Sequence, residues 1–99
     1  DLREGRFAIQ AHLDLHGMTL DGARSAVEVF FRESIRAGFR CVRVVHGRGR
    51  HSPDRQPVMK ESLQKWMRQR RLGRYVIAFT TARQFDGGGG AIYVLLGEK

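Results

Sequence analysis

The apolar spacing of the chain changes at Gly17, and this change constrains the fold more than any other feature. Before Gly17, Leu13 and Leu15 alternate with Asp14 and His16, which is the two-residue period of a β-strand. After Gly17, apolar side chains recur every three or four residues, which is the period of an amphipathic helix. The sequence therefore predicts a strand that leads directly into a helix.

The predicted helix has recognisable ends and is followed by a second strand. Thr19 is a suitable N-cap, Asp21 lies where a negative charge favours the helix dipole, and Gly38 is typical of a helix end. The apolar-face positions are Leu20, Ala23, Val27, Phe30, Phe31, Ser34 and Ile35. A β-branched run over residues 42–45 then predicts a strand that ends at His46. Because two strands joined by a helix are normally parallel, we expect a βαβ unit.

The second half of the chain predicts one more helix and two strands. Residues 47–56 show no apolar period and are expected to form a loop, and Pro57 suits the first turn of a helix. The apolar stripe of this helix, which we expect in the core and to end before Gly73, consists of Met59, Leu63, Trp66 and Met67. Residues 75–80 and 91–96 predict an antiparallel hairpin with a long loop. The expected fold is α/β, in the order β-α-β-α-β-β.

Length and charge limit the classes of partner. The 99 residues suit one domain, with residues 1–11 expected as a connector and residues 12–99 as the domain. The start without Met predicts a segment of a longer protein. A net charge of +8 favours polyanions, with nucleic acid as the leading partner. An anionic membrane is the rival, but no apolar run approaches the length that spans a membrane, and we expect no membrane partner. The single Cys41, expected to be a buried filler, excludes an internal disulfide and fits the cytoplasm.

Asp14 and His16 are the leading candidates for catalysis. On one face of a strand they lie about 7 Å apart along the backbone. An imidazole titrates near neutral pH, and a neighbouring carboxylate stabilises its protonated form, which suits a general acid or base. A pair of this kind at a strand end is also typical of capping and hydrogen bonding without chemistry. The pair alone does not separate these two interpretations.

Three polar segments follow the three strands that we expect to be parallel. They are His16 with Gly17, residues 46–52, and the glycines of residues 87–90. Ligands of open α/β sheets bind at the carboxyl ends of such strands. The candidate phosphate-binding residues there are Gly47, Arg48, Gly49, Arg50, His51, Ser52, Gly87, Gly88 and Gly90. The segment lacks the Lys-Ser/Thr ending of a P-loop, and an ordinary basic surface loop is the alternative.

Metal ligands and a second basic cluster complete the candidate sites. No standard zinc signature is matched by the available nitrogen and oxygen ligands, His12, Asp14, His16, His46 and His51. We therefore expect no built-in metal or cofactor, with a dependence on Mg²⁺ or Mn²⁺ left open. The arginines at the end of the second helix favour the helix dipole and extend an electrostatic track for nucleic acid; they are Arg68, Arg70, Arg71 and Arg74.

Taken together, these motifs resemble the Smr (small MutS-related) domain. The resemblance covers the chain from Leu13 onward, and the sequence is similar to the stand-alone bacterial Smr proteins. It implies a two-layer fold like the C-terminal domain of translation initiation factor three, with a mixed four-stranded sheet and the last strand inserted antiparallel. It also implies endonuclease activity on DNA or RNA. The family's Asp-x-His matches Asp14 and His16, and its Gly-x-Gly matches Gly47 and Gly49.

The function expected from the sequence is endonucleolytic cleavage of structured or single-stranded nucleic acid. Asp14 would orient or charge His16, His16 would move the proton, and His46 or His51 would be a second acid or base. Arg48 and Arg50 would neutralise the charge on the phosphorane. The alternatives are a nucleic-acid-binding module without turnover and, less favoured, an enzyme acting on a small phosphate compound. The expected partners extend to a ribosome or a larger nucleic-acid complex, and the oligomeric state stays open.

Overall fold

The computed structural model describes residues 8–47, 55–83 and 88–97, and the side chains of residues 55–57 and 88 are not described. The elements are β1 (Ala11–Asp14), α1 (Leu20–Arg36), β2 (Cys41–Val45), α2 (Arg55–Arg68), α3 (Arg70–Gly73), β3 (Val76–Thr81), the 3₁₀ turn η2 (Gly88–Gly90) and β4 (Ala91–Leu96). The predicted order β-α-β-α-β-β is confirmed, and α3 and η2 are short additions to it. No described helix has both the length and the apolar character needed to cross a membrane.

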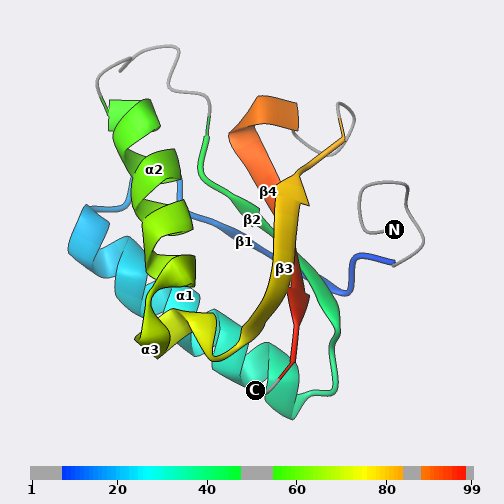
Figure 1. Ribbon diagram of the computed structural model, residues 1–99. Helices are drawn as coiled ribbons and strands as arrows, with labels where there is room; N and C mark the ends of the chain where they lie inside the picture. The colour runs from blue at the N-terminus through cyan, green and yellow to red at the C-terminus, as the bar shows by residue number, and fades with distance from the viewer. Residues whose placement is uncertain (1–7, 48–54, 84–87, 98–99) are drawn as a thin grey trace.

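The four strands form one mixed sheet in the order β1-β2-β4-β3 (Figure 1). β1 pairs with β2 in parallel, with Asp14 opposite Val45. β4 lies between β2 and β3 and is antiparallel to both. β1, β2 and β3 therefore point the same way, and their carboxyl ends meet at one edge of the sheet, as the sequence predicts.

α1 has the ends that the sequence predicts. Thr19 is its N-cap, and its hydroxyl accepts a hydrogen bond of 3.1 Å from the amide of Gly22. Gly38 follows the C-cap with a φ of +84°, a conformation that glycine adopts at no steric cost. The buried positions of the helix repeat at helical spacing and are Ala23, Val27, Phe31 and Ser34. α1 therefore packs by one face only.

The second helix is followed by a break that the sequence does not predict. Its apolar stripe ends before Gly73 as expected, since α2 ends at Arg68, but a single separate turn, α3, follows. The break occurs at Gln69, whose ψ of 152° is extended. Glycine is needed at position 73, at the end of α3, because a Cβ atom on this residue would stand 2.9 Å from the carbonyl oxygen of Met67. The chain thus turns tightly to place β3 at the edge of the sheet.

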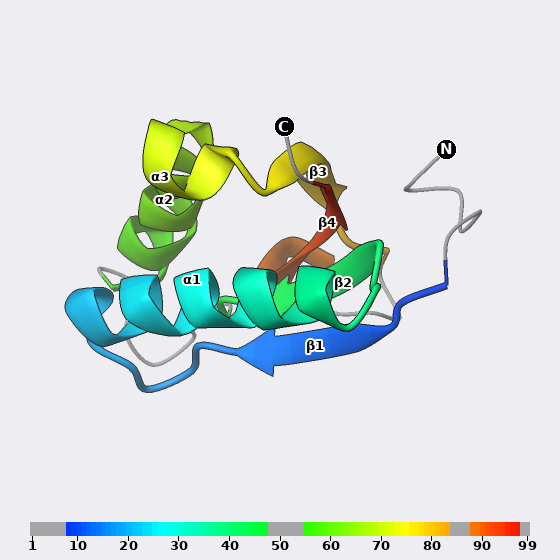
Figure 2. The same cartoon turned by 90° about the horizontal axis from the view of Figure 1, so that it is seen from below.

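One core lies between the two long helices and the sheet. It joins Phe31 of α1, Leu63 of α2 and Val94 of β4, which are all fully buried. Trp66, Met59 and Met67 also belong to it, in agreement with their predicted core role. Figure 2 shows α1 lying along β1, with α2 and α3 toward β3. The fold is a two-layer arrangement of helices on one face of a sheet.

The opposite face of the sheet holds a smaller apolar cluster. It consists of Ala82, Ala91 and Tyr93, with Ile9 and Val45 packed against it. The domain was expected to begin at residue 12. Hydrogen bonding to the sheet begins earlier, since the amide of Gln10 donates to the carbonyl of Cys41 at 2.9 Å. The Gln10 side-chain oxygen also accepts from the amide of Cys41 at 3.1 Å. Residues 1–7 of the expected connector lie outside the described residues.

Candidate functional site

Backbone hydrogen bonds join all four strands at the carboxyl edge of β1 and β2. The amide of Leu15 donates to the carbonyl of Val45 at 2.8 Å, which extends the β1–β2 pairing by one residue. The amide of Ala82 donates to the carbonyl of Ala91 at 3.0 Å, which joins the end of β3 to the start of β4. In Figure 1, η2 lies at the same end of the sheet as the end of β3. Side chains that follow these strands are therefore held on a single rigid edge.

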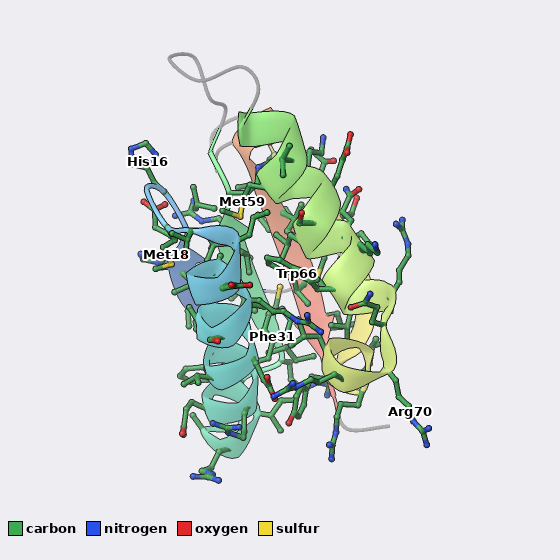
Figure 3. All side chains as sticks on the ribbon, turned by 90° about the vertical axis from the view of Figure 1, so that its left-hand side faces the viewer. His16, Met18, Phe31, Met59, Trp66 and Arg70 are labelled. Carbon is green, nitrogen blue, oxygen red and sulfur yellow. The ribbon has the colours of Figure 1, made fainter. Side chains whose placement is uncertain are left out.

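His16 lies in a tight turn that immediately follows this edge. The amide of Met18 donates to the carbonyl of Leu15 at 3.0 Å, and Gly17 has a φ of +80°. Positive φ at the third residue of a four-residue turn is the pattern of a type II turn, which places His16 at its first corner. His16 is exposed, and Figure 3 shows it projecting from one end of the molecule. The turn therefore presents the imidazole to solvent on a fixed backbone.

Asp14 supports this turn through the main chain. Its Oδ1 accepts a hydrogen bond of 2.8 Å from the backbone amide of His16. The carboxylate thus fixes the backbone at His16, an arrangement known as an Asx turn. The sequence predicts a carboxylate that orients or charges the imidazole itself. In the structure, the hydrogen bond between the two residues positions the ring indirectly, through the peptide group that carries it.

His46 is buried, with 5% of its surface exposed, so it does not share the exposed position of His16. Its Nδ1 lies 2.9 Å from the carbonyl oxygen of Gly47, and its buried Nε2 has no hydrogen-bond partner among the residues that the structure describes. Burial lowers the pKa of His46, and the charge of Lys60 lowers it further, against the opposing effect of the Gly47 hydrogen bond. The favoured form is a neutral ring that donates from Nδ1. Nε2 is then a buried acceptor without a donor in the described part of the chain.

Gly47 and Gly90 hold the edge together with their own backbone groups. The amides of His46 and Gly47 both donate to the carbonyl of Gly90 at 2.9 Å. Gly47 also accepts from His46 and has a φ of +88°, which explains the need for glycine at this position. The sequence places both glycines among phosphate contacts. In the structure the Gly47 amide and the Gly90 carbonyl are already engaged in joining β2 to β4.

The structure brings only part of the predicted site into view. The remaining loop candidates, Arg48, Gly49, Arg50, His51, Ser52 and Gly87, lie outside the described residues. Gly88 begins η2. Within the described ranges, no three His, Cys, Asp or Glu side chains lie close enough together to hold a metal ion.

Lys60 is the neighbour that sequence reasoning missed. It lies on α2 and acts on His46 across the fold, and no motif in the sequence connects the two residues. Only the folded structure brings Lys60 near enough for its charge to act on His46.

Comparison with known proteins identifies the family to which this fold belongs. The Smr domain model matches residues 13–97. The probable DNA endonuclease SmrA of Escherichia coli is 30% identical over 95 residues, which cover 96% of this chain and 49% of SmrA. The ribosome rescue factor SmrB of Tolumonas auensis is 33% identical over 98 residues, which cover 99% of this chain and 51% of SmrB. The chain thus spans about half the length of these relatives.

Two solved structures share the fold. YdaL, a stand-alone small MutS-related protein from Escherichia coli, matches with a TM-score of 0.81 and 30% identity, over 96% of this chain and 70% of YdaL. The Smr domain of Thermus thermophilus MutS2 matches with a TM-score of 0.75 and 24% identity, over 88% of this chain and 98% of that domain, and shows likeness of fold alone. The chain belongs to the Smr domain family.

Proposed function

We propose that this domain is a nucleic-acid endonuclease in which His16 transfers the proton during phosphodiester cleavage. The observation that carries the proposal is the exposed imidazole of His16, fixed by a type II turn and by Asp14 at the carboxyl edge of the parallel strands. The names of two relatives support the proposal: SmrA is a probable DNA endonuclease, and MutS2 of Caldanaerobacter subterraneus is named an endonuclease. The chain covers 11% of that MutS2.

The chemistry required of His16 depends on the nucleic acid. On RNA, the imidazole takes the proton from the 2′-hydroxyl next to the scissile phosphate, and that oxygen attacks the phosphorus. The bond from phosphorus to the 5′-oxygen breaks, and the leaving oxygen takes up a proton from the protonated imidazole or from water to become the 5′-hydroxyl. On DNA, water must be the nucleophile. The sequence supplies Arg48 and Arg50 directly after Gly47 as guanidinium groups for the charge that develops on the phosphorane. Because RNA carries its own nucleophile, the proposal favours RNA as the substrate.

Substitution of the exposed pair tests the assignment. We expect His16→Ala to lower the cleavage rate about 10²–10⁴-fold, the usual contribution of a general acid or base, with little change in nucleic-acid affinity. His12→Ala is the matched control, because His12 is also exposed on β1. Unchanged turnover in His16→Ala would remove His16 from the mechanism.

Two substitutions of Asp14 separate its charge from its hydrogen bond. Asn at this position keeps an oxygen that accepts from the His16 amide, whereas Ala does not. If Asp14 acts through the turn, Asp14→Asn should retain most of the activity that Asp14→Ala loses. Equal loss in both variants would show that the negative charge itself is required.

The product ends test the reaction on RNA. Attack by the 2′-hydroxyl leaves a 5′-hydroxyl on one product and a cyclic or 2′/3′-phosphate on the other, and we expect this cleavage to survive EDTA. Cleavage that stops in EDTA, returns with Mg²⁺ or Mn²⁺ and yields 5′-phosphates would instead make Asp14 a metal ligand. The nuclease proposal would survive that result, but proton transfer by His16 would not.

A binding module without turnover is the second candidate. The observation in its favour is that relatives such as SmrB are named ribosome rescue factors, a name that states no cleavage. In either case we propose that the partner is nucleic acid, including RNA met on a ribosome in the cytoplasm. Arg48→Ala with Arg50→Ala should then lower the salt slope of binding by about one phosphate equivalent for each arginine. Binding by the wild-type protein without any cleavage would decide for the module.

A further inference from the structure

The positive charge of the chain is concentrated in one segment. Residues 55–74 contain seven Lys or Arg residues and a single acidic residue, Glu61, for a net +6 of the chain's +8. Between Lys65 and Arg74 there are five basic residues and no acidic one. This part of the chain forms the end of α2 and all of α3. The excess charge is therefore local rather than spread over the surface.

Four of these basic side chains form an exposed surface at the end of the molecule away from His16. We call it the α3 basic surface, and it consists of Lys65, Arg68, Arg70 and Arg74. Figure 3 shows Arg70 at one end of the molecule and His16 at the other. The sequence predicts that the arginines of this segment extend an electrostatic track for nucleic acid, and this stays a prediction. In the structure Arg70 lies far from His16, so the α3 basic surface is separate from the edge that carries His16.

Aromatic rings lie behind two of these guanidinium groups. The guanidinium of Arg68 lies 5.5 Å from the centre of the Phe79 ring, and that of Arg74 lies 5.3 Å from the centre of the Tyr75 ring. A ring behind a guanidinium restricts its position and leaves its N–H donors free to meet an anion. Both groups are therefore partly ordered before any ligand arrives.

Arg71 has a different role from its neighbours. Its Nε lies 3.0 Å from a carboxylate oxygen of Glu28 on α1, so this pair joins α3 to α1. The Arg71 guanidinium balances the negative charge of Glu28. On α1, a carboxylate oxygen of Glu33 likewise lies 3.8 Å from a guanidinium nitrogen of Arg36. The dipole of α2 accounts for Lys65 and Arg68 in its last turn, but α3 is a single turn with a small dipole. Arg70 and Arg74 are therefore not explained by helix stability.

We propose that the α3 basic surface binds backbone phosphates of the same nucleic acid that His16 cleaves, at a second position far from the scissile bond. The inference rests on the proposed function and adds a substrate class to it: nucleic acid long or folded enough to reach both ends of the domain. The longest dimension of the molecule is 36 Å. The axis of B-form DNA rises about 3.4 Å per base pair, so about eleven base pairs of DNA have this length, and an A-form RNA duplex needs a few more because its rise is smaller. Shorter substrates reach only one of the two surfaces.

The test measures how affinity depends on substrate length. Binding is measured by fluorescence anisotropy in the His16→Ala background, with hairpin RNAs of about 6 and about 20 base pairs at several salt concentrations. The variant is Arg70→Ala with Arg74→Ala. We expect it to bind the long hairpin about tenfold more weakly, with a salt slope lower by about two, and to bind the short hairpin within about twofold of the parent.

Two controls separate a local surface from general charge. Arg24→Ala with Arg40→Ala removes the same charge from exposed positions on α1 and before β2, and should leave the long hairpin bound within about twofold. Arg70→Lys with Arg74→Lys keeps the charge and should retain most of the affinity. A thermal melt of each variant checks that it is folded.

The outcomes distinguish this inference from the function on which it rests. Equal loss of affinity for short and long hairpins, or equal loss in the Arg24 and Arg40 control, would overturn the second binding surface. Absence of cleavage of every RNA by the wild-type protein would overturn the nuclease proposal but leave the length dependence of binding intact. Length-dependent loss confined to the Arg70 and Arg74 variant supports the inference.

Discussion

Two glycines with nearly the same φ allow an effect on activity to be distinguished from an effect on stability. Gly17 has a φ of +80° beside His16, and Gly38 has a φ of +84° after α1, and a Cβ atom would meet nothing within 4 Å at either position. Alanine in this conformation costs about 1–2 kcal/mol. We expect Gly17→Ala and Gly38→Ala to lower the free energy of unfolding similarly in urea titrations. Only Gly17→Ala should also lower cleavage, since only it shifts His16. Equal activity in the two variants would contradict a fixed position for His16.

The buried ring of His46 predicts how stability depends on pH. Burial and Lys60 hold the pKa of His46 below its ordinary value, so the unfolded chain binds a proton more readily than the folded one. Stability contributed by the neutral ring is complete above about pH 6.5, the ordinary histidine pKa, and falls as the pH drops through that value. Urea titrations at pH 7.5 and 5.5 should show a larger loss in wild type than in His46→Gln. His12→Gln, at an exposed position, should behave like wild type.

For single residues, the sequence predicted which side of a strand they occupy but did not predict contacts between distant parts of the chain. Alternation alone predicted that Asp14 and His16 would leave the core side of the strand, and both are exposed. It did not predict that Asp14 would bond to a backbone amide, because that bond depends on the turn at Gly17. Nor did it predict the burial of His46, which depends on how distant parts of the chain pack around the end of β2.

The elements were predicted best where a local signal marks their ends. Thr19 and Gly38 bound α1 as expected, because capping is decided within a few residues. The end of α2 before Gly73 agrees with the sequence, but the break at Gln69 and the separate turn α3 were not predicted, because no glycine or proline marks them. That turn is imposed by the need to bring β3 against β4, a contact between distant parts of the chain.

The N-cap of α1 gives a prediction at the scale of one element. The Thr19 hydroxyl satisfies the amide of Gly22, so Thr19→Ala should lower the free energy of unfolding by about 1 kcal/mol. Ser25→Ala is the control, because Ser25 is exposed inside the same helix and should change stability little. Urea titrations of the two variants provide the comparison. A neutral Thr19→Ala would mean that water replaces the cap.

For the whole molecule, the sequence alone predicted the order of elements and the parallel βαβ unit. It also predicted that β3 and β4 are antiparallel. It did not by itself place β4 between β2 and β3, because both of those pairings join residues far apart in the chain. The resemblance to the Smr family supplied that arrangement, and the structure confirms it. The separation of the α3 basic surface from His16 likewise required the folded molecule.

The central place of β4 has a consequence for synthesis on the ribosome. β2 and β3 are both paired to β4, so neither has that partner until residues 91–96 have been made and released from the exit tunnel. We expect a chain that stops at residue 90 to remain sensitive to protease, whereas one that includes β4 should become resistant. Pulse proteolysis of ribosome-bound chains of increasing length would measure this. The rigid edge that carries His16 therefore forms only after residues 91–96 have left the tunnel.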